Sequence, residues 1–129
     1  MIKTKSIYKS KEREDGKRIL ISRLHPRGVK KSQYDEWLKE LSPSIELVHE
    51  YKNDKISWKK FLSLYKFEIS KNLQSLELIK QLRKQSKIYD VTLLCFEAEG
   101  DPCHRHLLRE IINKPSFLNK SFIPKFIDT

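Results

Sequence analysis

The apolar run "VTLLCF" at residues 91–96 constrains the fold more than any other stretch of the chain. Polar and apolar residues do not alternate in it, so we expect a strand that is buried on both faces, as in a parallel sheet. Two further strands are predicted, "IKTKSIY" at 2–8 and "ILIS" at 19–22. Lone strands separated by helices need crossover connections, which predicts an α/β layered domain. We expect "ILIS" and "VTLLCF" to lie parallel in one sheet, with helices on both faces.

Apolar residues recur at helical spacing in the segments between and after these strands. The predicted helices cover 34–41 with Ser32 as the N-cap, 58–69 with Ser57 as the N-cap, 73–82 and 107–112. Pro43 ends the first of them. The alternation of aromatic residues and lysines in "WKKFLSLYKF" fits core packing better than base stacking, because its aromatic residues share one helical face. We expect one domain at 1–114 and a C-terminal extension at 115–129 that packs on the body or on a second subunit.

The charge balance favours anionic partners. The chain of 129 residues has 27 Lys and Arg against 17 Asp and Glu, a formal net charge of +10. Nucleic acid, a phosphorylated ligand or an acidic surface would suit it, although a Lys-rich solvated surface explains the same numbers. No apolar run approaches the roughly 20 residues of a membrane helix, so no membrane partner is expected. The first residues lack a secretory signal, and two cysteines are few, which predicts a cytoplasmic protein with reduced thiols and no cofactor.

The stretch "CFEAEGDPCHRHLL" concentrates the reactive residues of the chain. Cys95 ends the predicted strand, at the edge where open α/β sheets bind ligands. Asp101 and Pro102 are typical of an N-cap and a first helical position. Cys103, His104 and Arg105 would then occupy the first turn, where free N–H groups favour an anion or a thiolate. His104 and His106 could equally be surface residues near the helix dipole.

The loop after the second strand is predicted to reach the same edge. It carries Arg23, His25 and Arg27, and with Arg105 these arginines could bind phosphate, sulfate or carboxylate in bidentate fashion. Structural roles compete with this interpretation. A cysteine in a buried strand often acts as a small apolar residue, and arginines in a loop often bind backbone carbonyls.

Two more specific chemistries fit the cysteines less well. Cys103 and Arg109 have the spacing of cysteine phosphatases, but the intervening residues look helical and include no glycine for a phosphate-binding loop. Cys95, Cys103 and a histidine could bind zinc, but the paired spacings of common zinc sites are missing. We predict no metal site.

Four segments resemble the domain-of-unknown-function family 488, which includes the YeaO-like proteins. They cover about residues 2–112 in the expected order: "IKTKSIYKSKEREDGKRILISRLHPRGVKK", "YDEWLKELSPS", "WKKFLSLYKFEI" and "VTLLCFEAEGDPCHRHLL". The resemblance implies a Rossmann-like α/β domain, with a small, mainly parallel sheet flanked by helices, and implies little about activity.

Three signatures of that family map onto this chain. Arg-x-x-Pro-Arg-Gly matches at Arg23, Pro26, Arg27 and Gly28, and Leu-Leu-Cys and Cys-His-Arg match at 93–95 and 103–105. YeaO-like members usually have Asp-Arg-Leu-Trp-Pro-Arg-Gly, where this chain has Ser22 and His25 at the first and fourth places. They also often lack Cys-His-Arg, so the resemblance does not imply one chemistry for the whole family.

Three functions follow from these observations. The first is a site for a small phosphate- or sulfur-bearing anion, held by Arg23, Arg27, Arg105 and His25, with Cys103 or Cys95 as a nucleophile and His104 as a base. The second is weak, non-specific nucleic-acid binding. The third is a structural domain without catalytic activity. We favour the first, and the sequence leaves open whether it includes catalysis and which oligomer forms.

Overall fold

A four-stranded parallel sheet organises the computed structural model, which describes residues 1–96 and 103–119. Its strands are β1 (Ile2–Ser6), β2 (Lys17–Leu20), β3 (Glu36–Trp37) and β4 (Val91–Cys95), in the order β1-β4-β2-β3. Strand β4 lies between β1 and β2 in parallel register, and all five of its residues are buried. The sheet therefore confirms the predicted α/β class and the parallel pairing of the "ILIS" and "VTLLCF" strands, although β2 begins two residues before "ILIS".

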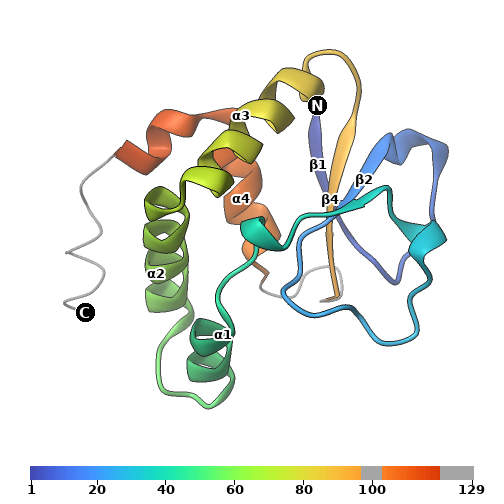
Figure 1. Cartoon of the computed structure of the whole chain (residues 1–129). Helices are drawn as coiled ribbons and strands as arrows, with labels where there is room; N and C mark the ends of the chain where they lie inside the picture. Colours follow the sequence, from blue (N-terminus) through green and yellow to red (C-terminus); the bar gives the residue numbers. More distant parts are fainter. Residues whose placement is uncertain (97–102, 120–129) are drawn as a thin grey trace.

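The helices gather on one side of this sheet. Helices α1 (Ile45–Lys52), α2 (Trp58–Lys71), α3 (Leu73–Ser86) and α4 (His104–Asn113) all stand to the left of the strands in Figure 1. Side chains from alternate strand positions enter the main core with them, among them Ile19, Ile21, Val91 and Leu93. The expectation of helices on both faces is wrong for the part of the chain that the structure describes. The opposite face offers only a small apolar cluster of buried residues, Ile7, Leu20 and Leu94, which is too little for a helix to cover.

Local capping explains where the helices begin. The Ser57 hydroxyl accepts a hydrogen bond from the Lys60 N–H, as predicted for α2. The Asn72 side chain does the same for the first turn of α3. Helix α1 was not predicted, although Ser44 caps it by accepting from the Leu47 N–H. This helix is short, and its apolar stripe is too brief to stand out in the sequence.

The segment predicted as a helix at 34–41 is instead the edge strand β3 between two 3₁₀ turns, Lys31–Gln33 and Lys39–Leu41. The Asp35 N–H donates to the Arg18 carbonyl and the Leu38 N–H to the Leu20 carbonyl, each at 2.8 Å. These bonds satisfy the edge of β2, and that gain outweighs the helical pattern of the apolar residues. Ser32 lies inside the first 3₁₀ turn and makes no N-cap.

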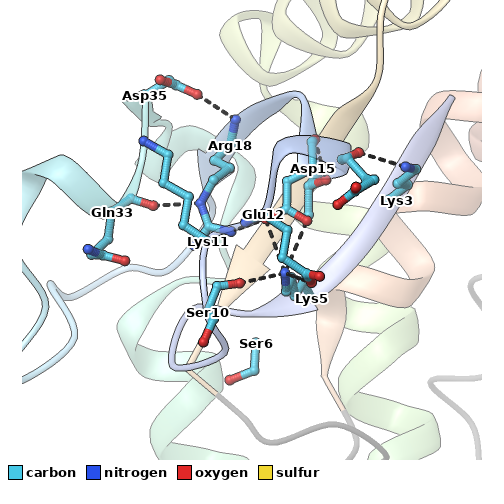
Figure 2. Close-up of polar contacts among 12 residues, drawn as sticks. Lys3, Lys5, Ser6, Ser10, Lys11, Glu12, Asp15, Arg18, Gln33 and Asp35 are labelled. Carbon is cyan, nitrogen blue, oxygen red and sulfur yellow. Dashed lines mark hydrogen bonds and ion pairs between the residues drawn. The ribbon is translucent and has the colours of Figure 1, made fainter.

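A network of charged side chains covers the face of the sheet that carries no helices (Figure 2). Asp15 is buried and accepts hydrogen bonds from Lys5 at 3.1 Å and from Arg18, whose side chain is fully buried. The Thr92 hydroxyl, on β4, donates to the Asp15 carbonyl at 2.6 Å. Burial by itself raises the pKa of Asp15, but hydrogen bonds from the Glu12 N–H, Lys5 and Arg18 hold that pKa below its ordinary value. Asp15 is therefore a buried carboxylate shared by Lys5 and Arg18, and Lys5 also pairs with Glu12.

After α4 the chain forms a 3₁₀ helix at Pro115–Asn119, and Leu118 joins the main core. The predicted division into a domain at 1–114 and an extension at 115–129 stays a prediction, because most of the proposed extension lies outside the described residues.

Candidate functional site

The candidate site lies where β2 and β4 end beside the start of α4. The Ile21 N–H donates to the Leu94 carbonyl at 2.9 Å, so the two strands keep their pairing up to this edge. Cys95 is the last residue of β4, and Cys103 lies just before α4. The two sulfur atoms are in bonding contact, and the structure pairs them as a disulfide. The predicted convergence of the cysteines is therefore found, whereas the structure does not hold them as the reduced thiols that we expected.

Cys103 is the N-cap residue of α4. Its sulfur accepts a hydrogen bond from the Arg105 N–H at 3.5 Å. The N-cap predicted at Asp101 is therefore wrong, and Asp101 and Pro102 themselves lie outside the described residues. A cysteine sulfur can serve as a weak acceptor in the place of the usual Ser or Asp oxygen, and the common N-cap preferences do not include cysteine.

His104 is buried and held in one tautomer. Its Nε2 lies 2.7 Å from the Ile21 carbonyl, which can only accept, so Nε2 carries the proton. Its Nδ1 lies 3.7 Å from the Cys103 sulfur. Burial lowers the pKa of His104 to about 4, and the positive charge of Arg105 adds to the effect, although the hydrogen bond to Ile21 opposes it. His104 is thus neutral near pH 7, and its unprotonated nitrogen faces the sulfur.

Arg105 is away from solvent, in contact with the Cys95 sulfur of the disulfide. It is fully buried, and its Nη1 lies 2.9 Å from the Cys95 sulfur. Cys95 is fully buried as well. The two cysteines therefore differ in their neighbours, because Cys103 has a histidine and a backbone N–H while Cys95 has a guanidinium.

A cavity of about 350 Å³ opens beside Cys103 and His104. Apolar side chains form most of its wall, a composition typical of small-molecule sites. Arg23 and Lys52 bring positive charge to it, and none of the lining residues is acidic. The lining residues come from the loop after β2, from α1 and the residue Pro43 before it, from the start of α2, from the residue after β4 and from the start of α4: Ser22, Arg23, Leu24, Pro43, Ile45, Val48, His49, Tyr51, Lys52, Trp58, Phe61, Phe96, Cys103 and His104.

Arg23 both lines this cavity and braces its wall. Its guanidinium donates to the carbonyls of Ser42 and Pro43 at 3.1 Å each, which is the structural role weighed for this residue. Two carbonyl contacts leave part of the five-donor guanidinium for other acceptors. Arg23 is half-buried and also lines a second, polar cavity of about 160 Å³ on its other side.

The other predicted anion ligands do not reach the cavity wall. His25 is exposed, bonds to the Tyr34 hydroxyl at 3.1 Å and packs edge-on against Trp37. Arg27 is exposed, and its carbonyl accepts from the Tyr8 hydroxyl at 2.9 Å. Arg105 lies beneath the disulfide. Of the four residues predicted to hold an anion, Arg23 alone is among the lining residues.

Lys52, His49 and Trp58 line the cavity, and none of them was predicted as a site residue. Two of them belong to α1, so they were missed together with that helix. Trp58 was assigned to the core, which is correct for part of its surface. The sequence signal that could have located these residues is the pair Ser44 and Ser57, which are the N-cap residues of α1 and α2.

The alternative chemistries gain no support from the geometry. The residues from His104 to Arg109 are helical, so no phosphate-binding loop connects Cys103 to Arg109. Within residues 1–96 and 103–119, no three metal-binding side chains of the His, Cys, Asp and Glu types come together. In the same ranges, no helix is both long enough and apolar enough to cross a bilayer.

The fold and the site define a small α/β protein with a cysteine pair at the carboxyl edge of a parallel sheet. A family model, DUF488-N3a, described as the active DUF488-N3 subclade, matches residues 2–116. The chain belongs to this family, as its resemblance to family 488 predicted.

Among curated proteins, the uncharacterized protein YeaO of Escherichia coli K12 is 34% identical over 89 residues, covering 67% of this chain and 77% of that protein. The uncharacterized protein Rv3073c of Mycobacterium tuberculosis H37Rv is 26% identical over 114 residues, covering 87% and 93%. No solved structure matches the chain significantly.

Proposed function

We propose that the cavity beside Cys103 binds a small anionic molecule with an apolar body, and that the thiol chemistry of Cys103 acts on it. The observation that carries this proposal is the shared wall: Arg23, Cys103 and His104 all line one cavity. A positive charge and a sulfur therefore face the same bound molecule.

The composition of the wall defines the ligand class. Aromatic and aliphatic side chains favour an apolar body, because they remove its surface from water. The guanidinium of Arg23 would bind a carboxylate, sulfonate or phosphate, in an orientation already fixed by its bonds to Ser42 and Pro43. Lys52 is exposed and adds a second positive charge at the opening. The sequence predicted this role for Arg23, Arg27, Arg105 and His25, and the proposal assigns it mainly to Arg23, which is the one of the four that lines the cavity.

Binding of naphthalene-1-sulfonate, followed by its fluorescence, tests the proposal. The variants are Arg23→Gln and Arg27→Gln, which each remove one positive charge, so the net charge of the two proteins is the same. We expect Arg23→Gln to weaken binding about tenfold or more and Arg27→Gln to leave it within about twofold, since a charge-assisted hydrogen bond contributes about 1.5–3 kcal/mol. Equal losses in the two variants would show a response to net charge alone and would overturn the proposal.

The melting temperature of each variant provides the folding control. Arg23 braces Ser42 and Pro43, so Arg23→Gln also loses two structural hydrogen bonds. Arg23→Lys keeps the charge and should retain more affinity than Arg23→Gln. If the two variants lose affinity equally while both remain folded, the charge of Arg23 is not what binds the sulfonate.

Nucleic-acid binding stays a prediction that rests on the net charge of +10 alone. It would appear as weak, sequence-independent binding of single-stranded oligonucleotides that falls steeply with salt. Fluorescence anisotropy at two salt concentrations measures it. Absence of binding at low salt would remove this alternative.

A further inference from the structure

The two cysteines differ in access to the cavity as well as in their neighbours. Both cysteines are buried, Cys103 with 3% of its surface exposed and Cys95 with none, but Cys103 lines the cavity and Cys95 is not among the lining residues. A bound molecule can therefore reach the Cys103 sulfur first. We propose that Cys95 and Cys103 form a working dithiol–disulfide pair, in which Cys103 exchanges with a low-molecular-weight thiol or disulfide and Cys95 is the resolving cysteine. The inference rests on the proposed function only in placing the substrate in the cavity.

The exchange needs no reactant beyond the small thiol. A substrate thiolate, R–S⁻, attacks the Cys103 sulfur, the Cys103–Cys95 bond breaks, and its electron pair leaves on Cys95 as a thiolate. A second thiolate attacks the substrate sulfur of the mixed disulfide, which forms R–S–S–R and leaves Cys103 as a thiolate. Two electrons pass from two thiols to the protein disulfide. In the reverse direction, the dithiol form reduces a small disulfide by the same steps.

The leaving group of the first step lies beside a cation. The guanidinium Nη1 of Arg105 is 2.9 Å from the Cys95 sulfur, and both groups are away from water. A positive group next to a thiolate stabilises it, and a stabilised thiolate leaves faster. In the reverse direction, the same contact keeps Cys95 as a thiolate that can resolve the mixed disulfide.

The Cys103 sulfur, which is attacked in the first step, has different partners from those of Cys95. The Arg105 N–H lies 3.5 Å from the Cys103 sulfur at the start of a ten-residue helix, where the dipole also favours negative charge. The unprotonated Nδ1 of His104 faces the same sulfur at 3.7 Å. When Cys103 is reduced, this nitrogen accepts the S–H hydrogen bond and orients the thiol, and solvent takes the proton.

The experiment uses the full-length protein, reduced, freed of reductant and mixed with 5,5′-dithiobis(2-nitrobenzoate), an anionic aromatic disulfide. Attack by Cys103 releases one coloured thiolate, and resolution by Cys95 releases a second. We expect the wild type to release two equivalents and to end as a disulfide without adduct. Cys95→Ser should release one equivalent at a similar initial rate and keep the adduct on Cys103, as seen by mass spectrometry. Cys103→Ser should react at least tenfold more slowly.

The same variants in guanidinium chloride provide the matched control. There the two single-cysteine proteins should react at similar rates, because the difference comes from the fold. Two outcomes would overturn the proposal. One is equal rates for folded Cys95→Ser and Cys103→Ser, and the other is a wild type that carries two adducts and no disulfide.

A neutral probe separates this inference from anion binding. With 2-hydroxyethyl disulfide the order of attack should be unchanged, because access and leaving group do not depend on the charge of the substrate. If that order holds while Arg23→Gln and Arg27→Gln bind the sulfonate equally, anion binding fails and the dithiol pair stands. If the order fails while Arg23 is needed for the sulfonate, the pair fails and the anion site stands.

The role of Arg105 has its own measurement. The rate of the second release, after the mixed disulfide has formed, should fall about tenfold in Arg105→Gln and less in Arg105→Lys, which keeps the charge. Equal second-step rates in wild type and a folded Arg105→Gln would exclude stabilisation of the Cys95 thiolate by Arg105. The cysteine variants test the order of attack even if the buried arginine cannot be replaced.

Discussion

The two faces of the sheet are stabilised in different ways, one by apolar packing and the other by buried ion pairs. The helix-covered face is apolar and leaves a cavity of about 350 Å³ at its carboxyl edge, where the cysteines lie. The other face is closed by loops over buried charges, with Asp15 between Lys5 and Arg18. Apolar packing has no direction and can leave space for a ligand, whereas an ion network fixes each partner at short range. The two cysteines lie on the side where the packing leaves a cavity.

The network face, meaning the face covered by Asp15, Lys5 and Arg18, should lose more stability on a single substitution than the helix-covered face, which we call the cavity face. Asp15→Asn leaves the buried Lys5 and Arg18 without their shared carboxylate, and we expect a loss of about 3 kcal/mol or more in the free energy of unfolding. Glu12→Gln is the matched control, because Glu12 also pairs with Lys5 but has an exposed side chain, and it should cost less than about 1 kcal/mol. Urea unfolding measures both. Similar losses in the two variants would mean that burial of the carboxylate is not what stabilises this face.

The cavity face should lose stability in mild acid. The pKa of His104 is about 4 in the folded protein and about 6.5 when unfolded, so the unfolded state binds more protons between these values. Stability is fully present above pH 6.5 and falls as the pH drops towards 4, by about 3 kcal/mol in all. His104→Gln keeps an N–H for the Ile21 carbonyl and should lose this part of the pH dependence. Identical slopes in wild type and variant between pH 7 and pH 4 would contradict the buried neutral histidine.

The smallest of these stability effects is expected from alanine substitutions at two glycines with positive φ, Gly16 and Gly28. A Cβ at Gly16 (φ 65°) would collide with the Asp90 backbone, whereas a Cβ at Gly28 (φ 78°) would meet nothing within 4 Å. Gly28→Ala should therefore cost only the conformational strain, about 1 kcal/mol, and Gly16→Ala clearly more. Thermal unfolding of both variants measures the difference. A loss at Gly28 as large as that at Gly16 would mean that the backbone between Asp15 and β2 is not held tightly.

The sequence was enough to predict strands β1, β2 and β4, helices α2 and α3 and the convergence of Cys95 with Cys103. Each follows from local pattern together with the geometry of strand ends. The error at 34–41 has a tertiary cause, since Trp37 and its neighbours satisfy the edge of β2 while keeping a helix-like spacing of apolar residues.

Many residues that line the cavity could not be predicted either, because tertiary packing decides which side chains meet there. Lys52 and His49 belong to a helix of eight residues, whose pattern is too short to identify. The separation of Arg105 from Arg23 depends on which side of the disulfide each guanidinium lies. Sequence spacing places both near the strand ends but does not distinguish the cavity wall from the buried layer behind it.

The central claim is that the anion-binding cavity and the reactive thiol are one site. The most direct measurement is the rate at which iodoacetamide alkylates Cys103 in the reduced protein, with and without saturating naphthalene-1-sulfonate, resolved from Cys95 by mass spectrometry. We expect Cys103, which lines the cavity, to react faster than Cys95, which does not, and the sulfonate to slow Cys103 at least fivefold in wild type. A Cys103 rate unchanged by bound sulfonate would contradict the claim, because the ligand and the thiol would then occupy different places.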